Sequence, residues 1–206
     1  MKKITLIVGS PRKNKSCDFL VENAIEGLKS VSDDFNINKI FIDNFNLSPC
    51  TGCDQCLREP YECPLAENDD THEIEKYLLD TDALLIASPT YFGSVSAQIK
   101  TLIDRSRPWK MNGYKLADTI FAPLVAQGLR NGGGGGVKTD LINFALIQGM
   151  ICVGSLGNPV IEENIPVTSL QKYERTAFLK KDESDELGAK IAHNLGKRVA
   201  ELLQKF

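Results

Sequence analysis

Four cysteines, Cys50, Cys53, Cys56 and Cys63, lie within fourteen residues in the spacing C-x2-C-x2-C-x6-C. Thiolates are soft ligands, and four of them close together can hold an iron–sulfur cluster. The two-residue gaps let one tight loop turn three sulfurs toward a common centre, and the six-residue gap lets the chain return with the fourth. The sequence therefore predicts a metal centre in which all four cysteines ligate one cluster.

Three other interpretations of this run stay open. Structural zinc sites usually take two C-x2-C pairs a dozen or more residues apart, which three cysteines in seven residues match poorly. Disulfides need an oxidising compartment, for which the sequence gives no sign. Free thiols on a loop beside a redox cofactor are the third interpretation, and the spacing alone does not separate them from cluster ligands.

Composition narrows the class of protein. A chain of 206 residues, 42 % of them hydrophobic, fits a single domain over residues 1–206 with a substantial core. The net charge of −3 argues against a nucleic-acid binder. The run Ile4–Val8 after Met1-Lys2-Lys3 is too short for a signal peptide, and no stretch approaches the roughly 18 apolar residues of a membrane span. We therefore expect a cytoplasmic protein.

The loop Gly9–Ser16 joins the apolar strand Ile4–Val8 to a helix with apolar residues recurring from Phe19 to Leu28. A helix N-terminus offers backbone N–H groups and partial positive charge, which favour a phosphate. The P-loop and dinucleotide glycine patterns are absent, so a mononucleotide with one phosphate fits best. An ordinary loop with solvated cations is the alternative. The loop's hydroxyl donors and cations are Ser10, Ser16, Arg12 and Lys15.

Two further loops follow predicted strands. Ser88–Ser96 comes after the strand Ala83–Ala87, and its aromatic pair beside proline and glycine would suit a flat ring, or would simply cover the core. The strand Thr119–Ala126, with Pro123 awkward inside it, precedes the five glycines of Gly132–Gly136. These glycines allow close approach of a ligand, or provide flexibility alone.

The remaining segments complete an alternating pattern. Phe35–Asp43 is predicted as a strand near a sheet edge, and Met150–Gly154 as a fifth strand that holds Cys152 as a buried, inert thiol. The cysteine-rich loop, residues 47–70, ends in polar residues that would cap a helix from Glu73 to Leu79. Residues 156–206 form an irregular excursion over 157–180 and then a helix from Asp182. The two histidines, His72 and His193, are isolated and are not expected to be ligands.

Strands alternating with helices predict an α/β fold with a five-stranded parallel sheet between two helical layers. The flavodoxin-like strand order 2-1-3-4-5 places FMN at the switch between the first and third strands. The loops after strands one, three and four converge there, and they are the three loops singled out above.

Three motifs carry a family resemblance. Gly9-Ser10-Pro11-Arg12, Ser88–Gly93 and the glycine-rich turn from Gly128 resemble the NADPH-dependent FMN reductase family, over roughly residues 1–155. The cysteine run resembles the iron–sulfur flavoprotein branch of that family. The resemblance implies a [4Fe–4S] cluster on Cys50, Cys53, Cys56 and Cys63, non-covalent FMN, and a homodimer or homotetramer in which each cluster lies near a neighbouring subunit's flavin.

The resemblance also implies which residues contact FMN. The first loop would hold the phosphate, the second would flank the isoalloxazine ring, and the third would close its other side. In chain order the implied residues are Ser10, Arg12, Ser16 and Cys17; then Pro89, Thr90, Tyr91, Phe92 and Gly93; then Gly128, Asn131 and Gly132.

The expected function is electron transfer between FMN and the cluster, with a small molecule or a ferredoxin-type protein as electron donor. No general acid, base or nucleophile is expected, because the two cofactors carry the chemistry. A cluster-free reductase that takes NAD(P)H and reduces FMN or a quinone is the first alternative. A non-enzymatic flavin-binding electron carrier or regulator is the second.

Overall fold

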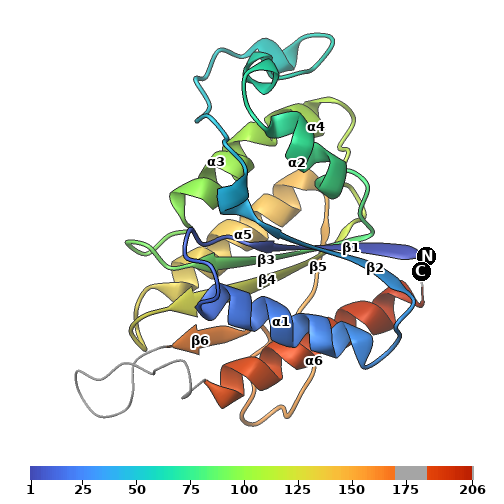
Figure 1. The fold of residues 1–206 in the computed structure, drawn as a ribbon, viewed down its shortest axis with the longest axis vertical. Helices are drawn as coiled ribbons and strands as arrows, with labels where there is room; N and C mark the ends of the chain where they lie inside the picture. The colour runs from blue at the N-terminus through green and yellow to red at the C-terminus, as the bar shows by residue number, and fades with distance from the viewer. Residues whose placement is uncertain (170–184, 206) are drawn as a thin grey trace.

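The computed structural model describes residues 1–169 and 185–205. A parallel sheet forms the middle of three layers, with helices on both of its faces (Figure 1). Two helices, α1 (Ser16–Lys29) and α6 (Glu186–Leu203), cover one face. The other face carries α2 (Thr71–Leu78), α3 (Ala97–Arg105), α4 (Arg107–Met111) and α5 (Gly134–Gln148).

The sheet has the predicted flavodoxin-like order, β2-β1-β3-β4-β5, with an additional short strand beside β4. Side chains of central strands alternate between the two helical layers, so the strands are apolar throughout. Leu6 pairs with Leu85 in the cluster under α1 and α6, and Ile7 pairs with Ile86 in the opposite cluster. The strands are β1 (Lys2–Val8), β2 (Phe35–Phe41), β3 (Ala83–Pro89), β4 (Ile120–Gln127), β5 (Ile151–Cys152) and β6 (Val167–Ser169).

The predicted fifth strand, Met150–Gly154, is wrong in its length. β5 pairs only with Ile120 and Phe121, and Cys152 within it is half-buried rather than buried. β6 continues the same edge by pairing with Val125–Gln127, inside the region predicted to be irregular. Residues 153–166 therefore interrupt one edge position that two short strands share.

Pro123 sits at this interruption. The Phe121 carbonyl accepts from the Val153 N–H (2.9 Å), and the Val125 N–H donates to the Pro166 carbonyl (3.0 Å). Alternate residues of a strand face the same neighbour, so the Pro123 nitrogen faces the gap between these two bonds. A residue without an N–H is therefore tolerated inside β4, because neither β5 nor β6 pairs with Pro123 on that side.

Residues 153–166 contact α6 through Glu162, whose side chain is 2 % exposed. Lys190 Nζ lies 2.8 Å from its carboxylate, and the Asn194 amide donates to it at 2.7 Å. The hydrogen bond from Lys190 holds the pKa of Glu162 below its ordinary value of 4.5, and burial opposes this effect. Glu162 therefore stays charged in the folded protein down to a lower pH than an ordinary glutamate does.

We expect this carboxylate to make stability depend on pH. Because its folded pKa is lowered, its contribution is present above the ordinary value of 4.5 and is lost as pH falls through the lower folded value. The variant Glu162→Gln should lose less free energy of unfolding than wild type between about pH 6 and pH 3, measured by urea unfolding. Glu163→Gln, at a neighbouring side chain that is 60 % exposed, is the control. Equal losses in Glu162→Gln and wild type would contradict the assignment.

Helices α1 and α6 touch through their backbones. A Cβ atom added at Gly27 would lie 1.9 Å from the His193 carbonyl oxygen, and one added at Gly196 would lie 2.0 Å from the Ala24 carbonyl oxygen. α6 begins at Glu186, with Asp185 as its N-cap, whereas the predicted start at Asp182 lies outside the described residues. None of the described helices is long and apolar enough to cross a membrane.

The cysteine-rich loop (residues 47–70) extends from the end of the sheet beyond α2, α3 and α4, at the top of Figure 1. It follows β2 and the 3-10 turn Ile42–Asn44, and it contains two further 3-10 turns, Gln55–Leu57 and Pro64–Glu67. Its position beside α3 and α4 brings the cysteines near charged residues of those helices.

Candidate functional site

Hydrogen bonds join the loops after β1 and β3. The Gly9 N–H donates to the Ala87 carbonyl (2.7 Å), and the Ser96 hydroxyl donates to the Gly9 carbonyl (2.6 Å). Ser96 also caps α3 and donates its own N–H to the Ser88 hydroxyl (3.2 Å). These hydrogen bonds join the two loops at the switch between β1 and β3, where a ligand would lie at the carboxyl ends of the strands.

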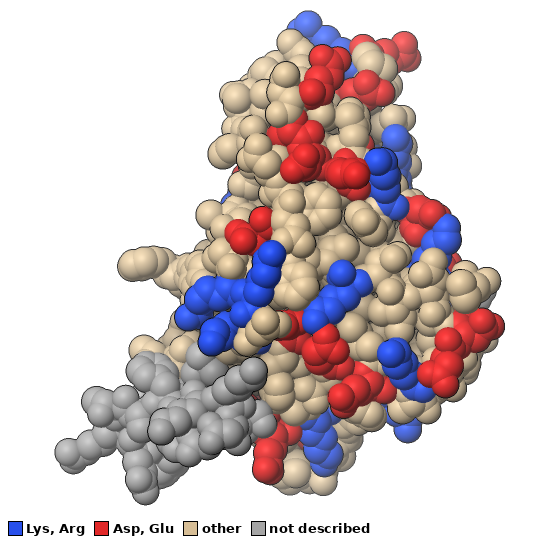
Figure 2. Space-filling model, in the orientation of Figure 1, with Lys and Arg blue, Asp and Glu red and all other residues tan. Residues whose placement is uncertain are grey.

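The first loop has the features of a phosphate site. Ser10 is buried and its hydroxyl accepts from the Arg12 N–H (3.1 Å), while Arg12 and Lys15 are exposed. No side chain of the described residues caps the N-terminus of α1, where Ser16 is the first residue. Figure 2 shows Lys and Arg side chains gathered over this region. Uncapped backbone N–H groups beside cations fit a phosphate group.

The Cys17 side chain is buried in the core next to that loop. It is 2 % exposed and lies in the apolar cluster with Val8 and Leu20. Burial raises the pKa of Cys17 to about 12, so the thiol remains neutral. Any contribution of this residue to a phosphate site therefore comes from its backbone N–H.

The second loop is a tight turn with strained geometry. Tyr91 and Ser94 exchange both backbone hydrogen bonds (3.0 and 3.2 Å), and Phe92 and Gly93 between them have φ of 49° and 82°. Positive φ at both central residues defines a type I′ turn, which a phenylalanine occupies at a cost. Phe92 is fully exposed, so the alternative that it covers the core is wrong.

The glycine run holds this turn in place. A Cβ atom at Gly133 would lie 2.9 Å from the Gly93 Cα, and one at Gly136 would lie 2.1 Å from the Gly93 oxygen. The Ser94 hydroxyl donates to Asp140 of α5 (2.6 Å). Gly133 and Gly136 therefore permit backbone contact between the start of α5 and the turn, and α5 starts at Gly134 rather than at the predicted Val137.

Thr90 carries a buried hydroxyl that has no hydrogen-bond partner among the described residues. Its backbone N–H donates to the Ala126 carbonyl (2.7 Å), which fixes the residue at the ends of β3 and β4. The third loop lies next to it, and Asn131 there lines a cavity of about 250 Å³. An unpartnered hydroxyl at this position fits a polar atom of a bound flavin.

All six cysteines are free thiols, which does not support the disulfide interpretation. Cys50 and Cys53 are exposed, and Cys56 and Cys63 are half-buried. Burial raises the pKa of Cys56, the charge of Arg107 lowers it, and the charges of Cys63 and Cys50 raise it, so three of the thiols lie within electrostatic reach of one another.

No three His, Cys, Asp or Glu side chains within residues 1–169 and 185–205 are arranged to hold a metal ion. An iron–sulfur cluster needs a different arrangement of ligands from a single ion. Each of its irons takes one thiolate, so the four sulfurs need not converge on one atom. Four free, soft donors on one loop fit this requirement in their chemistry.

A buried ion pair closes the base of the cysteine-rich loop. Arg105, 1 % exposed, donates to Asp69 (2.5 Å) and to the Ser48 carbonyl (2.7 Å), and its other terminal nitrogen donates to the Thr71 hydroxyl (2.7 Å). Sequence reasoning assigned Asp69 to helix capping and missed Arg105. The available signal was spacing, since Arg105 follows Ile99 and Leu102 on the buried face of α3.

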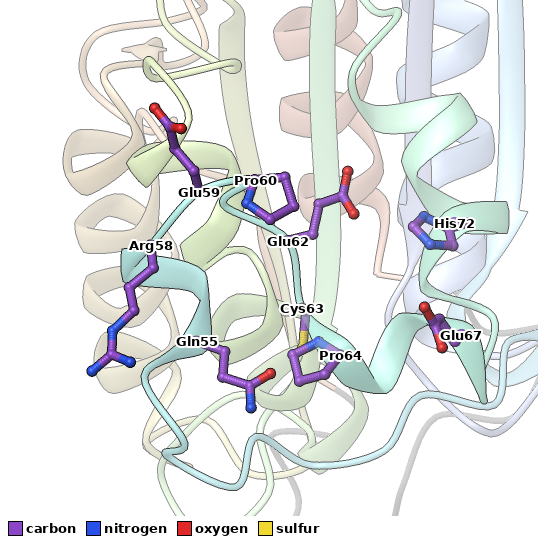
Figure 3. Close-up of a pocket in the computed structure, with 9 residues that line it drawn as sticks. All are labelled: Gln55, Arg58, Glu59, Pro60, Glu62, Cys63, Pro64, Glu67 and His72. Atoms are coloured by element: carbon purple, nitrogen blue, oxygen red, sulfur yellow. The ribbon is translucent and has the colours of Figure 1, made fainter.

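A cavity of about 410 Å³ opens beside Cys63 (Figure 3). Glu59, Glu62 and Glu67 line it, all exposed and without an ion pair to any residue that the structure describes. A smaller cavity of about 140 Å³ reaches the same cysteine from the side of Trp109. Cys63, the fourth cysteine of the run, therefore lines both cavities.

The strand order and the joined loops at the β1–β3 switch define a flavodoxin-like protein. Residues 2–159 match the family model described as NADPH-dependent FMN reductase. The chain is 36 % identical over 202 residues to an iron-sulfur flavoprotein of Archaeoglobus fulgidus, covering 98 % of this chain and 96 % of the relative. It is 34 % identical over 205 residues to the iron-sulfur flavoprotein MJ1083 of Methanocaldococcus jannaschii, covering 98 % and 97 %.

Among solved structures, a WrbA-like flavodoxin from Agrobacterium tumefaciens superposes with a TM-score of 0.62 at 18 % identity, covering 100 % of this chain and 99 % of that one. The chain belongs to the NADPH-dependent FMN reductase family. It is an FMN-dependent oxidoreductase with a flavodoxin-like fold, as the sequence predicted.

Proposed function

We propose that this protein passes electrons between FMN and a [4Fe–4S] cluster that Cys50, Cys53, Cys56 and Cys63 ligate. The observation that carries the proposal is the set of four free thiols on one loop, in a chain whose relatives over nearly its full length are named iron-sulfur flavoproteins. FMN exchanges two electrons with one partner and single electrons with another, and a cluster carries one electron at a time.

In this proposal the chain's own residues bind FMN and orient its ring. Arg12 and the N-terminus of α1 hold the phosphate, together with Ser10, Ser16 and the Cys17 backbone. The Thr90 hydroxyl and the turn Tyr91–Gly93 hold the ring with Pro89. The third loop closes the other side through Gly128, Asn131 and Gly132.

A cluster-free reductase that uses NAD(P)H is the second candidate, and the family description favours it. Protein purified without oxygen should separate the two. About four irons and matching acid-labile sulfide per chain would support the cluster. Stoichiometric FMN, no iron, and steady turnover with NAD(P)H would support the plain reductase.

We further infer a cytoplasmic homodimer or homotetramer that receives electrons from a small molecule or a ferredoxin-type protein. Exposed carboxylates lie around Cys63 and at the top of Figure 2. Because like charges repel, they favour an electron donor whose contact surface is not strongly negative. Sedimentation of the FMN-loaded protein tests the assembly, and the salt dependence of reduction by each donor tests the charge.

Arg12→Ala should weaken FMN binding, because it removes one charge-assisted phosphate contact worth about 1.5–3 kcal/mol, or roughly 10- to 150-fold in Kd. Flavin titration of the apoprotein, followed by fluorescence, measures the change. Lys13→Ala is the matched control, since that cation lies in the same loop but donates to the Asn44 side chain (2.6 Å). Unchanged affinity in Arg12→Ala would show that the phosphate lies elsewhere.

A further inference from the structure

Arg105 lies between the protein core and the cysteine-rich loop. Its guanidinium bonds to the Ser48 carbonyl at the start of the loop and to the Thr71 hydroxyl at its end. The Asp69 carboxylate pairs with the same guanidinium and also accepts from the Ser48 N–H (3.0 Å). The planar fork of an arginine is thus held in one orientation by contacts on both ends of the loop.

One donor of this guanidinium is left over. The Nε of Arg105 is buried and has no hydrogen-bond partner among the described residues. The pKa of Arg105 is raised above its ordinary value: burial lowers it, but the hydrogen bond with Asp69 and the nearby Cys63 side chain raise it more, so Cys63 lies within interaction range of the guanidinium. A buried charged donor without an acceptor is costly, and the Cys63 sulfur, as a cluster ligand, would supply an acceptor for Nε.

We propose that Arg105 is a positioning residue for the iron–sulfur centre, which directs a hydrogen bond and a buried positive charge at the Cys63 sulfur. Hydrogen bonds to ligand sulfurs and nearby charge set the potential of a cluster. Arg105 therefore makes the centre easier to reduce and slows its loss. This role rests on the proposed function, because it requires that Cys63 ligates a cluster.

Arg107 provides a natural comparison two residues further along. It is 39 % exposed, pairs with Asp54 (2.6 Å), and lies within electrostatic reach of Cys56 and Cys50. Solvent screens its charge, whereas the charge of Arg105 acts in a buried environment. The two arginines therefore separate a general effect of positive charge from the effect of a buried, oriented donor.

Two variants test the proposal in anaerobically purified, FMN-loaded protein. Arg105→Lys keeps the charge and removes Nε, and the double variant Arg105→Gln with Asp69→Asn removes both buried charges together, so that neither is left uncompensated. Both should release iron to a chelator about 10- to 100-fold faster than wild type. In both, the midpoint potential of the cluster should become more negative, while FMN content stays at the wild-type level. Arg107→Gln should change either quantity much less.

If both Arg105 variants keep the wild-type midpoint potential and the wild-type rate of iron release, the proposal is wrong. Loss of iron together with FMN or with folded structure, at an unchanged potential of the remaining cluster, would also overturn it and leave Arg105 a structural role. Wild-type protein without iron and sulfide would refute the proposed function instead, and that measurement comes before any variant is made.

Discussion

Alanine at any one of Cys50, Cys53, Cys56 or Cys63 should remove most of the bound iron and leave FMN in place. Each substitution deletes a thiolate, and neutral water replaces a soft anionic ligand poorly. Flavin is expected to stay because its three loops lie at the β1–β3 switch, whereas the cysteines lie on the loop beyond α2–α4. Iron, sulfide and flavin content of anaerobically purified variants would be measured against about four irons per chain in wild type.

The other two cysteines are controls of different kinds. Cys152→Ala changes a half-buried thiol in β5, and Cys17→Ala changes a core thiol in α1, so neither should alter iron content. One zinc per chain without sulfide would indicate a tetrahedral zinc site. Four alkylatable thiols in folded wild-type protein, with neither metal, would leave the plain FMN reductase as the function.

Gly196→Ala should destabilise the protein by about 3 kcal/mol or more, at the upper end of overpacking effects. Its new methyl group would lie 2.0 Å from the Ala24 carbonyl oxygen, which is backbone and cannot rotate away. Gly27→Ala meets the His193 carbonyl oxygen at 1.9 Å and should behave alike. Either change forces α1 and α6 apart along the face where they cover the sheet. Urea unfolding measures the loss of free energy.

Gly135→Ala is the matched control, because it is also a helical glycine and a Cβ there would meet nothing within 4 Å. It should be neutral or stabilising by about 0.4–1 kcal/mol, through reduced freedom of the unfolded chain. Similar unfolding midpoints for Gly135→Ala and Gly196→Ala would show that the helices separate without cost.

The parallel sheet was predictable because the central strands are apolar throughout, a pattern that a sheet covered on both faces produces. Its order was predictable because strands alternate with helices along the chain, as in a flavodoxin-like fold. The division of the fifth strand was not predictable. β5 and β6 are two and three residues long, and each is a strand only because a different half of β4 lies beside it. The start of α5 was missed because glycines have poor helix propensity, whereas Gly134–Gly136 form its first turn in the structure.

The candidate site shows the same limit. Sequence motifs indicated the three loops, and the contacts of Arg12, Thr90 and Phe92 with FMN stay predictions. The burial of Cys17 depends on which face of α1 packs on the sheet. A shift of that face by one residue would expose Cys17, and the sequence pattern does not locate the face that closely. Arg105 was missed because charged residues are usually read as solvent-exposed, and its partner Asp69 is distant in sequence.

The divided edge also bears on solubility. A long, flat outer strand presents a continuous row of unpaired N–H and C=O groups, onto which another chain can add itself. Here the row beyond β4 is broken by residues 153–166, and Pro123 supplies no donor where the break occurs. Within the described residues, an incoming strand would find two consecutive strand positions on β5 and three on β6. The interruption therefore disfavours edge-to-edge pairing with another chain on this side of the sheet.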